Sequence, residues 1–526
     1  MNLVDFSASS FSILPAIFAL GLAIVTRRVL LSLGLGILSG ALLLNDFSIA
    51  NTTSYISSLV FSMFVSDGAI NFGKMSIVIF LVFVGMITAL MTLSGGTAAF
   101  AEWAQSRVKS KRGAKLLASF LGVFIFIDDY FNSLAVGAIS RPVTDRFHVS
   151  RAKLAYILDS TAAPMCVIMP ASSWGAYIIT VIGGILVSHG VTEYTPLSAF
   201  AHMIPMNFYA IFALLMVFAV AWFQMDVGPM RRFEYQASTG SRLGDDENSS
   251  ASIEDELGIE ESSNGSVSDL IVPIMVLIIA TISWMIFSGA KVLDANGVAF
   301  SVLGAFENTN VGESLLYGSG MGLLSALFTV FKQGLPKADI ANTMWIGAKS
   351  MFGAILILFF AWTIGSVIGD METGKFLSSL IEDNLSPQLL PVLLFLLSAA
   401  MAFSTGTSWG TFGIMLPIAG DLAGATDIAL MLPMLSAVLA GAVFGDHCSP
   451  ISDTTILSAT GARCGHIDHV STQLPYALAG AVIAAISFLV LGYTDSLTIS
   501  WLSGFSVFVL VCLFFGWLSR RPGKLA

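Results

Sequence analysis

The chain carries a series of apolar stretches, most of them long enough to cross a lipid bilayer, which takes about 20 residues of helix. We place them at 9–26, 29–45, 75–97, 153–188, 200–224, 269–288, 313–331, 349–370, 428–462, 471–493 and 497–518. Only 11% of the 526 residues are charged, whereas a soluble domain carries roughly 25%. The predicted fold class is therefore an all-α polytopic membrane protein. The first stretch, which ends at Arg27 and Arg28, is expected to be a retained helix.

Two further apolar stretches, 114–140 and 389–419, are interrupted at their centres by "DDYFNS" and "STGTSWGT". Basic clusters at 107–115 and 141–153 flank the first of them. Because basic loops stay on the cytoplasmic side, we expect 114–140 to be a re-entrant hairpin, and 389–419 to be a second one from the opposite face. All but Lys74, Lys291 and Lys375 of the 24 Lys and Arg then share one side. The prediction is about eleven transmembrane helices plus two hairpins in a bacterial inner membrane, with the N-terminus outside and the C-terminus cytoplasmic.

The two halves of the chain resemble each other weakly but in order. A shift of 276 residues aligns Asp128–Ser133 with Ser404–Trp409 and Gly137 with Gly413, and a shift of 286 aligns Pro164 with Pro450 and Ser172 with Ser458. Each half is predicted to contain, in order, a helix, a hairpin, a long helix interrupted by polar residues, and another helix. The two copies start on opposite sides of the membrane. Inverted repeats with broken helices are typical of secondary transporters, whose binding site lies near the midplane.

The repeats also suggest how the chain divides. We expect a first membrane repeat at 1–224, a linker at 225–268, and a second repeat with a C-terminal helix at 269–526. The linker holds ten acidic and three basic residues, is rich in serine and poor in aromatic residues, and is expected to be a disordered cytoplasmic segment.

The interrupted segments carry the chemistry. Segments 153–188 and 428–462 are too long to cross as straight helices, and prolines mark the expected breaks, at Pro164 and Pro170 in the first and at Pro450 in the second. Each segment also contains aspartate, at Asp159 and at Asp446. Unwound backbone at membrane depth lines a cavity or is buried in protein, and its carbonyls suit a hard cation such as Na⁺. An aspartate there costs about 2.5 kcal/mol or more. Since neither break and neither hairpin centre contains Lys or Arg, the expected partner is a cation or a proton.

The repeat groups these residues into two candidate clusters that join one hairpin tip to one break. The first combines Asp128, Asp129, Asn132 and Ser133 with Asp159, Ser160, Thr161, Ser172 and Ser173. The second combines Ser404, Thr405, Thr407 and Ser408 with Asp446, His447, Ser449, Ser452, Asp453, Thr454 and Thr455. For each hydroxyl the alternative is a structural role, capping a broken helix. Asp159, Asp446 and Asp453 are also the candidate proton carriers, and His447 is either a proton-sensing group or a brace for the break.

The sequence "GDHCSPISDTTILSATGA" followed by "HIDHVSTQLPYA", with "DDYFNSLAVG" and "LDSTAAPMCV" in the first half, resembles the NhaC family of sodium/proton antiporters. The resemblance runs over most of the chain except the acidic linker, and 445–476 is its most specific part. It implies sodium coupling within a wider group of ion transporters that have inverted repeats and hairpins. It leaves the cargo open, because relatives of this family exchange organic acids or carry amino acids.

The expected function is sodium-coupled secondary transport by alternating access, with Na⁺/H⁺ antiport first and Na⁺-coupled transport of an amino acid or small organic acid as the alternative. An enzyme is not expected, because no nucleophile or cofactor arrangement surrounds the aspartates. No cofactor is expected beyond Na⁺ as the coupling ion. The partners expected are the lipid bilayer, Na⁺ and H⁺, with no nucleic acid, and the sequence leaves a homodimer open.

Three weaker signals accompany these predictions. Trp174 and Trp409, each within an "SWG" sequence, either shape a pocket for an organic substrate or pack against glycine-rich breaks. Cys448, Cys464, His466 and His469 have residue types that bind zinc, although Cys448 belongs to a membrane break. The four cysteines lie in or beside apolar segments and do not suggest a disulfide framework.

Overall fold

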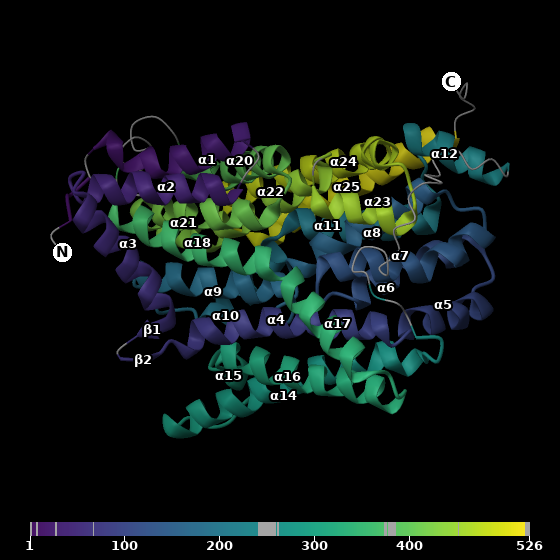
Figure 1. Cartoon of the computed structure of the whole chain (residues 1–526). Helices are drawn as coiled ribbons and strands as arrows, with labels where there is room; N and C mark the ends of the chain where they lie inside the picture. The colour runs from purple at the N-terminus through teal and green to yellow at the C-terminus, as the bar shows by residue number, and fades with distance from the viewer. Residues whose placement is uncertain are drawn as a thin grey trace.

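The fold is a bundle of helices with one short β-hairpin, seen in a computed structural model (Figure 1). The structure describes residues 3–6, 9–26, 29–66, 68–239, 259, 262–372, 376, 386–450 and 452–520. In the first half the helices are α1 (Leu14–Thr26), α2 (Val29–Leu44), α3 (Ile49–Phe64), α4 (Phe72–Leu93), α5 (Gly96–Arg107), α6 (Lys111–Phe124), α7 (Asp129–Arg146), α8 (Arg151–Cys166), α9 (Ser173–Ser188), α10 (Pro196–Met203), α11 (Phe208–Phe223) and α12 (Pro229–Ser238). Strands β1 (Val65–Ser66) and β2 (Ala69–Ile70) pair antiparallel, with Val65 opposite Ile70.

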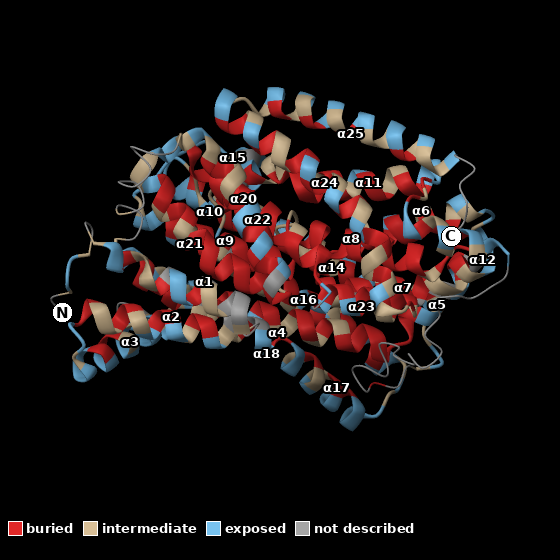
Figure 2. Ribbon diagram, turned by 90° about the horizontal axis from the view of Figure 1, so that it is seen from above, coloured by how far each residue is buried: buried red, intermediate tan, exposed pale blue. Residues whose placement is uncertain are grey.

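In the second half, α-helices are joined by short turns and loops, and the structure shows no β-strand among the described residues. Its helices are α14 (Val267–Ala295), α15 (Val302–Glu307), α16 (Val311–Lys332), α17 (Lys337–Ser350), α18 (Phe352–Asp370), α20 (Leu390–Thr405), α21 (Ser408–Thr426), α22 (Met431–Cys448), α23 (Asp453–Ala462), α24 (His466–Thr494) and α25 (Leu497–Arg520). Buried residues concentrate along α8 and α22 in the middle of the molecule, whereas α25 at its edge is largely exposed (Figure 2).

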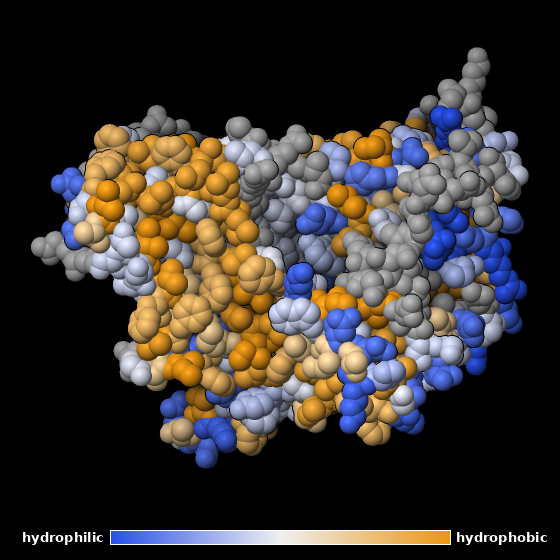
Figure 3. Space-filling model, viewed as in Figure 1, coloured by the Kyte–Doolittle hydropathy of each residue, from blue (hydrophilic) through white to orange (hydrophobic). Residues whose placement is uncertain are grey.

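The molecule has two chemically distinct ends. Hydrophilic residues gather at the end where α12 lies, and hydrophobic residues cover much of the rest of the face shown in Figure 3. We call the first the basic end, because Lys111, Arg146 and Arg151 lie at helix termini there, and the other the N-terminal end (Figure 1). The hydrophobic band between them is the surface that lipid would cover, as the sequence predicted for a polytopic α-helical membrane protein.

Six described helices are long and apolar enough to cross a membrane, or seven if the pair 196–206 and 208–223, bent by 52°, counts as one span. The other expected crossings are built from shorter or broken helices. Those expected at 9–26 and 29–45 are α1 and α2, of 13 and 16 residues, or roughly 20 and 24 Å at 1.5 Å per residue. The backbone of Pro15 meets Gly36, and the ring of Pro15 meets Gly40, while Thr26 contacts Ser32. The two short helices therefore pack against each other as an antiparallel pair.

The hairpin expected at 114–140 is formed by α6 and α7, which begin and end at the basic end (Figure 1). Lys111 Nζ, at the start of α6, donates a hydrogen bond of 2.7 Å to the carbonyl of His148, just after α7. The two basic flanks of the hairpin therefore meet, as the charge pattern predicted. Helices α20 and α21 form the second hairpin in the half of the molecule nearer the N-terminal end (Figure 1).

Both long interrupted segments are broken helices. The first is α8 and α9 with a break at 167–172, and the second is α22 and α23 with a break at 449–452. Helices α8 and α23 lie toward the basic end, and α9 and α22 toward the N-terminal end, so the two copies run in opposite directions (Figure 1).

The positions of the two helix breaks correct one aligned pair of residues in the predicted repeat. Ser172 and Ser452 are the N-caps of α9 and α23, and each accepts a hydrogen bond from the backbone N–H three residues on. Pro170 therefore corresponds to Pro450. The pairing of Pro164 with Pro450 is wrong, because Pro164 lies within the last turn of α8 and does not break it.

The acidic segment expected at 225–268 begins as ordered structure. Asp226 forms an ion pair of 2.9 Å with the fully buried Lys153, and Glu234 in α12 forms one of 2.8 Å with Lys111. Residues 240–258, which hold most of the acidic charge, lie outside the described residues. The expected linker boundary at 225 is therefore too early, because these ion pairs hold 226–238 on the basic end.

Candidate functional site

The tip of the first hairpin meets the start of α9. The hydroxyl of Ser173 donates a hydrogen bond of 3.0 Å to Asp128 Oδ2, and the N–H of Ser173 donates one of 2.8 Å to the carbonyl of Ile127 in the tip. The backbone N–H of Tyr130 donates to Asp128 Oδ1. Because Asp128 precedes α7 and faces the start of α9, its carboxylate lies at the positive ends of two helix dipoles.

Asp129 and Trp174, which follow Asp128 and Ser173 in the chain, also form a hydrogen bond with each other. The indole Nε1 of Trp174 donates a hydrogen bond of 2.9 Å to Asp129 Oδ1, and both side chains are buried. The Trp174 ring packs edge-on against Trp409, with centroids 6.0 Å apart, and against Phe412. The two "SWG" sequences, one from each repeat, therefore meet at the centre of the molecule, with one tryptophan holding an aspartate.

The second SWG serine also holds an aspartate. Ser408, the first residue of α21, donates to Asp446 Oδ2 through its hydroxyl at 2.7 Å and through its backbone N–H at 3.1 Å. Asp446 lies in the last turn of α22, immediately before the second break. Asp128 and Asp446 are thus held by the serines of the two SWG sequences, at the starts of α9 and α21.

Three buried oxygens in this region have no hydrogen-bond partner among the described residues: Asp129 Oδ2, Asn132 Oδ1 and Asp446 Oδ1. Asp129 and Asn132 are three residues apart on α7 and so share a helix face. Asp446 is close enough to Asp129 for the two carboxylates to interact electrostatically. We call Asp128, Asp129, Asn132 and Asp446 the carboxylate cluster. It offers anionic and amide oxygens of the kind that hard cations bind.

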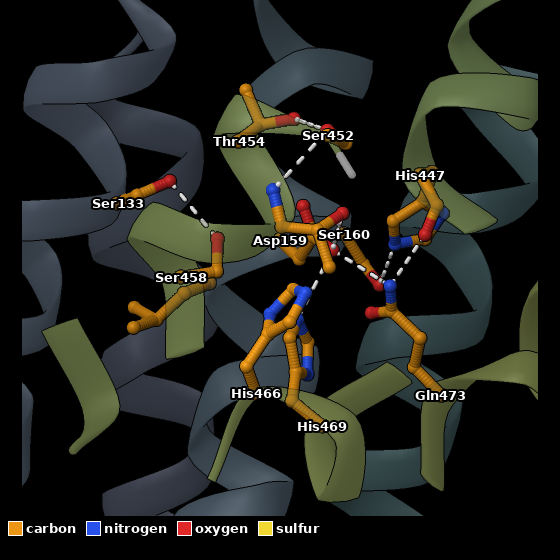
Figure 4. Close-up of polar contacts among 12 residues, drawn as sticks. Ser133, Asp159, Ser160, His447, Ser452, Thr454, Ser458, His466, His469 and Gln473 are labelled. Atoms are coloured by element: carbon orange, nitrogen blue, oxygen red, sulfur yellow. Dashed lines mark hydrogen bonds and ion pairs between the residues drawn. The ribbon is translucent and has the colours of Figure 1, made fainter. Parts of the chain in front are cut away.

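A second network surrounds Asp159, which is fully buried in α8. Its Oδ2 accepts three hydrogen bonds: 3.1 Å from Thr455 Oγ1, 3.2 Å from His469 Nε2 and 2.7 Å from Gln473 Nε2. The donors come from α23 and α24, and Figure 4 shows His469 and Gln473 pointing toward Asp159. We call Asp159, Thr455, His469 and Gln473 the Asp159 network.

His447 connects the network to the carboxylate cluster. Its Nε2 contacts Ser160 Oγ at 2.9 Å, and its Nδ1 contacts Tyr209 Oη at 2.7 Å. Gln473 also donates to the His447 carbonyl. Because His447 directly follows Asp446, the last turn of α22 touches both groups of residues.

The expected grouping of tips and breaks is therefore partly wrong. Asp128 and Asp129 do meet Ser173 and Trp174, as the first cluster required, but Asp159 and Ser160 do not join them. Asp159 lies one to two turns before the break, and helix α8 presents it to α23 and α24 of the other repeat. The sequence did not indicate this, because the residues that contact Asp159 lie on α23 and α24 and not on the first hairpin.

Most of the other residues expected in the site bond to nearby residues of the chain or join two neighbouring helices. Ser133 Oγ contacts Ser458 Oγ at 3.1 Å, which joins α7 to α23. Asp453 is exposed and accepts a hydrogen bond of 3.2 Å from Tyr130. Hydroxyls that bond to backbone carbonyls or to a neighbouring hydroxyl are those of Thr161, Thr405, Ser449, Ser452 and Thr454. The carbonyl of Thr407 accepts from Thr411. Ser404 ends α20, and its side chain lies outside the described part of the structure.

Sequence reasoning did not assign Tyr130, Tyr209 or Gln473 to the site, and it considered His469 only as a zinc ligand. Gln473 and His469 are four residues apart and so lie on one face of α24. That spacing, inside the quoted "HIDHVSTQLPYA", was the available signal. Within the described residues no group of three or more His, Cys, Asp or Glu side chains is arranged to hold a metal ion.

A cavity of about 830 Å³ lies at the N-terminal end, between α9, α18 and α21. Lys74, His189, Asp370 and Asp421 are among its lining residues, and His189 Nε2 contacts Asp421 Oδ1 at 3.0 Å across it. Its deepest contact on α9, Thr180, is one turn from Tyr177, whose ring packs on Trp409. The aromatic group of Trp174, Tyr177, Trp409 and Phe412 thus stands between the cavity and Asp129.

Comparison with known proteins adds to this geometry. The sequence profile described as "Na+/H+ antiporter family" matches residues 165–493, which run from the first break through most of α24. The chain belongs to the Na⁺/H⁺ antiporter family. As a member of that family it is a multi-pass membrane protein and a secondary antiporter, not an enzyme.

Three relatives place it within the family. An uncharacterised protein of Haemophilus influenzae is 57% identical over 94% of this chain and 93% of its own length. A malate-2H⁺/Na⁺-lactate antiporter of Bacillus subtilis is 31% identical over 32% of this chain and 36% of its own. An uncharacterised Na⁺/H⁺ antiporter of Haemophilus influenzae is 33% identical over 31% and 35%. The last two therefore share about a third of their length with this antiporter.

Proposed function

We propose that this antiporter exchanges Na⁺ for H⁺ across a bacterial inner membrane, with its N-terminus outside and its C-terminus in the cytoplasm. The observation that carries the proposal is the set of three buried oxygens without partners, on Asp129, Asn132 and Asp446. An unpaired carboxylate in a membrane interior is costly, and a cation or a proton offsets that cost. The profile of the Na⁺/H⁺ antiporter family supports the same ions.

In the proposed cycle, the carboxylate cluster binds Na⁺ or a proton but not both. Asp129 and Asp446 come from opposite repeats, α7 in the first and α22 in the second. Movement of one repeat against the other would therefore open the cluster to one side of the membrane at a time. The Ser173 hydroxyl at the start of α9 donates to Asp128, and the hydroxyl and N–H of Ser408 at the start of α21 donate to Asp446. With the positive ends of these helix dipoles, they stabilise the carboxylates when no ion is bound.

The test uses purified protein in liposomes with an imposed pH gradient and no organic solute. Adding Na⁺ is expected to dissipate the gradient, and Asp129→Asn and Asp446→Asn are each expected to reduce the rate at least tenfold while the protein still inserts. Asp145→Asn is the matched control, because Asp145 lies in the last turn of α7 at the basic end and pairs with Arg151. Normal Na⁺ affinity in both cluster variants would contradict the proposed cation site.

The alternative function is Na⁺-coupled transport of an amino acid or small organic acid. It is favoured by the cavity of about 830 Å³, whose lining includes both Lys74 and acidic side chains, because pockets for small molecules measure about 300–1,000 Å³. The relative named for malate and lactate exchange also carries organic acids. If the pH gradient in liposomes responds to Na⁺ only after an organic acid or amino acid is supplied, this alternative replaces Na⁺/H⁺ antiport.

A further inference from the structure

The Asp159 network is built for a different ligand from the one that suits the carboxylate cluster. All three of its contacts to Asp159 Oδ2 are donors: a threonine hydroxyl, an imidazole N–H and an amide N–H. The Oδ1 of Asp159 is buried without a hydrogen-bond partner among the described residues, like the open oxygens of the carboxylate cluster. The difference lies at Oδ2, where three donor hydrogens hold a hard cation away, because such a cation needs oxygen ligands. A proton needs only a basic atom to bind to and a series of groups that can carry it there.

A route for protons leads toward the basic end along the first turn of α24. His466, which begins α24, is half-buried, and its Nε2 contacts the carbonyl of Pro450 at 2.6 Å. His469 follows one turn later and reaches Asp159. The Nδ1 atoms of both imidazoles are buried without a hydrogen-bond partner among the described residues. The two residues are three apart and so share a face of α24, and Figure 4 draws both rings below Asp159 in that view.

The titratable groups named here around Asp159 come from three other helices. His469 faces it from α24, His447 and the thiol of Cys448 interact with it from α22, and Tyr209 interacts with it from α11. The surroundings contain imidazoles that can take up a proton, whereas none of the ion pairs found among the described residues joins Asp159 to a lysine or arginine. A neutral histidine accepts a proton at one ring nitrogen while it donates from the other.

We propose that Asp159 and His469 form a proton-binding site separate from the carboxylate cluster, and that His466 connects it with the basic end. In this step a proton adds to Nδ1 of His469 and the proton on Nε2 passes to Asp159 Oδ2, so the pair gains one proton and one positive charge. The inference rests on the proposed Na⁺/H⁺ exchange and deepens it. His447 and Gln473 link the pair to Asp446, which allows occupancy of one site to affect the other.

The test separates sodium movement from proton movement. Exchange of ²²Na⁺ across liposomes with equal pH and equal Na⁺ on both sides needs the carboxylate cluster but no net proton transfer. His469→Gln keeps a side-chain amide donor for Asp159 and loses the titrating group. We expect this variant to keep ²²Na⁺ exchange within threefold of wild type and to lose Na⁺-driven proton movement at least tenfold.

Two further variants complete the design. Asp159→Asn is expected to show the same split between sodium exchange and proton movement, which keeps the test usable if His469→Gln folds poorly by size-exclusion chromatography. His202→Gln is the control, because His202 is exposed and contacts Ser198 in its own helix and the ring of Tyr194, none of which belongs to the Asp159 network.

Coupled proton movement with an unchanged pH profile in His469→Gln and Asp159→Asn would overturn the inference and leave Na⁺/H⁺ exchange standing. Absence of ²²Na⁺ exchange in the wild-type protein would instead overturn the proposed function itself.

Discussion

Removing the indole N–H of Trp174, which is a hydrogen-bond donor, is expected to weaken activation of transport by Na⁺. Trp174→Phe keeps an aromatic ring against Trp409 and Phe412 and removes the 2.9 Å hydrogen bond to Asp129. Without that donor the carboxylate is less stabilised and holds a competing proton more firmly. A hydrogen bond to a charged group contributes roughly 1.5 kcal/mol or more, so we expect about tenfold weaker activation by Na⁺ at pH 7.

The pH dependence distinguishes this effect from loosened packing. Raising the pH removes the competing proton, so the deficit of Trp174→Phe in liposome transport is expected to shrink toward pH 9. Trp409→Phe is the control, because Trp409 packs on Trp174 but makes no described contact with a carboxylate. A deficit that is the same at every pH would show that Trp174 acts through packing alone.

Sequence reasoning found most of these residues but not all of their partners. Buried aspartates stand out among apolar neighbours, so Asp128, Asp129, Asp159 and Asp446 could be predicted. The partners of Asp159 could not, because His469 and Gln473 lie 310 and 314 residues further along the chain. No local sequence pattern predicts which face of α8 contacts which turn of α24.

At the scale of elements, α7 and α23 touch through glycine. A Cβ added to Gly137 would lie 2.7 Å from the backbone carbonyl carbon of Gly461, closer than real Cβ contacts allow. Gly137→Ala is therefore expected to push α23 away from the first hairpin and to weaken the Ser133–Ser458 and Tyr130–Asp453 contacts. Overpacking of this kind costs roughly 1–3 kcal/mol.

The measurement for Gly137→Ala is the midpoint of thermal unfolding in detergent together with transport in liposomes, and both are expected to fall. Gly516→Ala on α25 is the matched control, because a Cβ there meets nothing within 4 Å. Equal unfolding midpoints for the two variants would contradict the close packing of α7 and α23.

Helix α12 is held by charge at the basic end. Burial alone would raise the pKa of Glu234, but Lys115, Lys111 and Lys153 outweigh it and hold the pKa below its ordinary value of 4.5. Glu234 also accepts hydrogen bonds from the N–H and hydroxyl of Ser150, the N-cap of α8. Since the folded pKa is lowered, this stabilisation is fully present above about pH 4.5 and is lost as the pH falls through the folded value.

We therefore expect amide hydrogen exchange in 229–238 to stay slow from pH 7 to pH 5 and to accelerate below that range, after correction for the intrinsic rate. Glu234→Gln is expected to exchange faster throughout, while Glu102→Gln, an exposed residue of α5, is expected to match wild type. Slow exchange in Glu234→Gln at pH 7 would show that the charge does not hold α12.

For the whole molecule, the arrangement predicts which residues share a side of the membrane. Lys109→Cys and Arg146→Cys, on the two flanks of the first hairpin, are expected to react with an impermeant thiol reagent from the same, cytoplasmic side. Ser188→Cys, which lines the cavity at the N-terminal end, is expected to react from the other side. Labelling of Lys109→Cys and Arg146→Cys from opposite sides would contradict the hairpin and the inverted repeat.

The sequence predicted the fold best where charge and polarity mark it. Paired basic flanks identified the first hairpin, and prolines with serines identified both breaks. Hydropathy does not state how α1 and α2 pack. Their contact depends on Gly36 and Gly40, which approach Pro15 closely.

The contact between Asp159 and α24 also bears on how the protein is made. Gln473 leaves the ribosome 314 residues after Asp159, which at 5–20 residues per second takes roughly 15–60 s. During that interval the aspartate lacks the three donors that later bind it, and exposure to lipid is costly. The first half of the nascent chain must therefore wait beside the insertion machinery or in contact with water. Chains truncated before residue 466 are expected to be degraded quickly in cells, whereas chains truncated after residue 494, where α24 ends, are expected to persist.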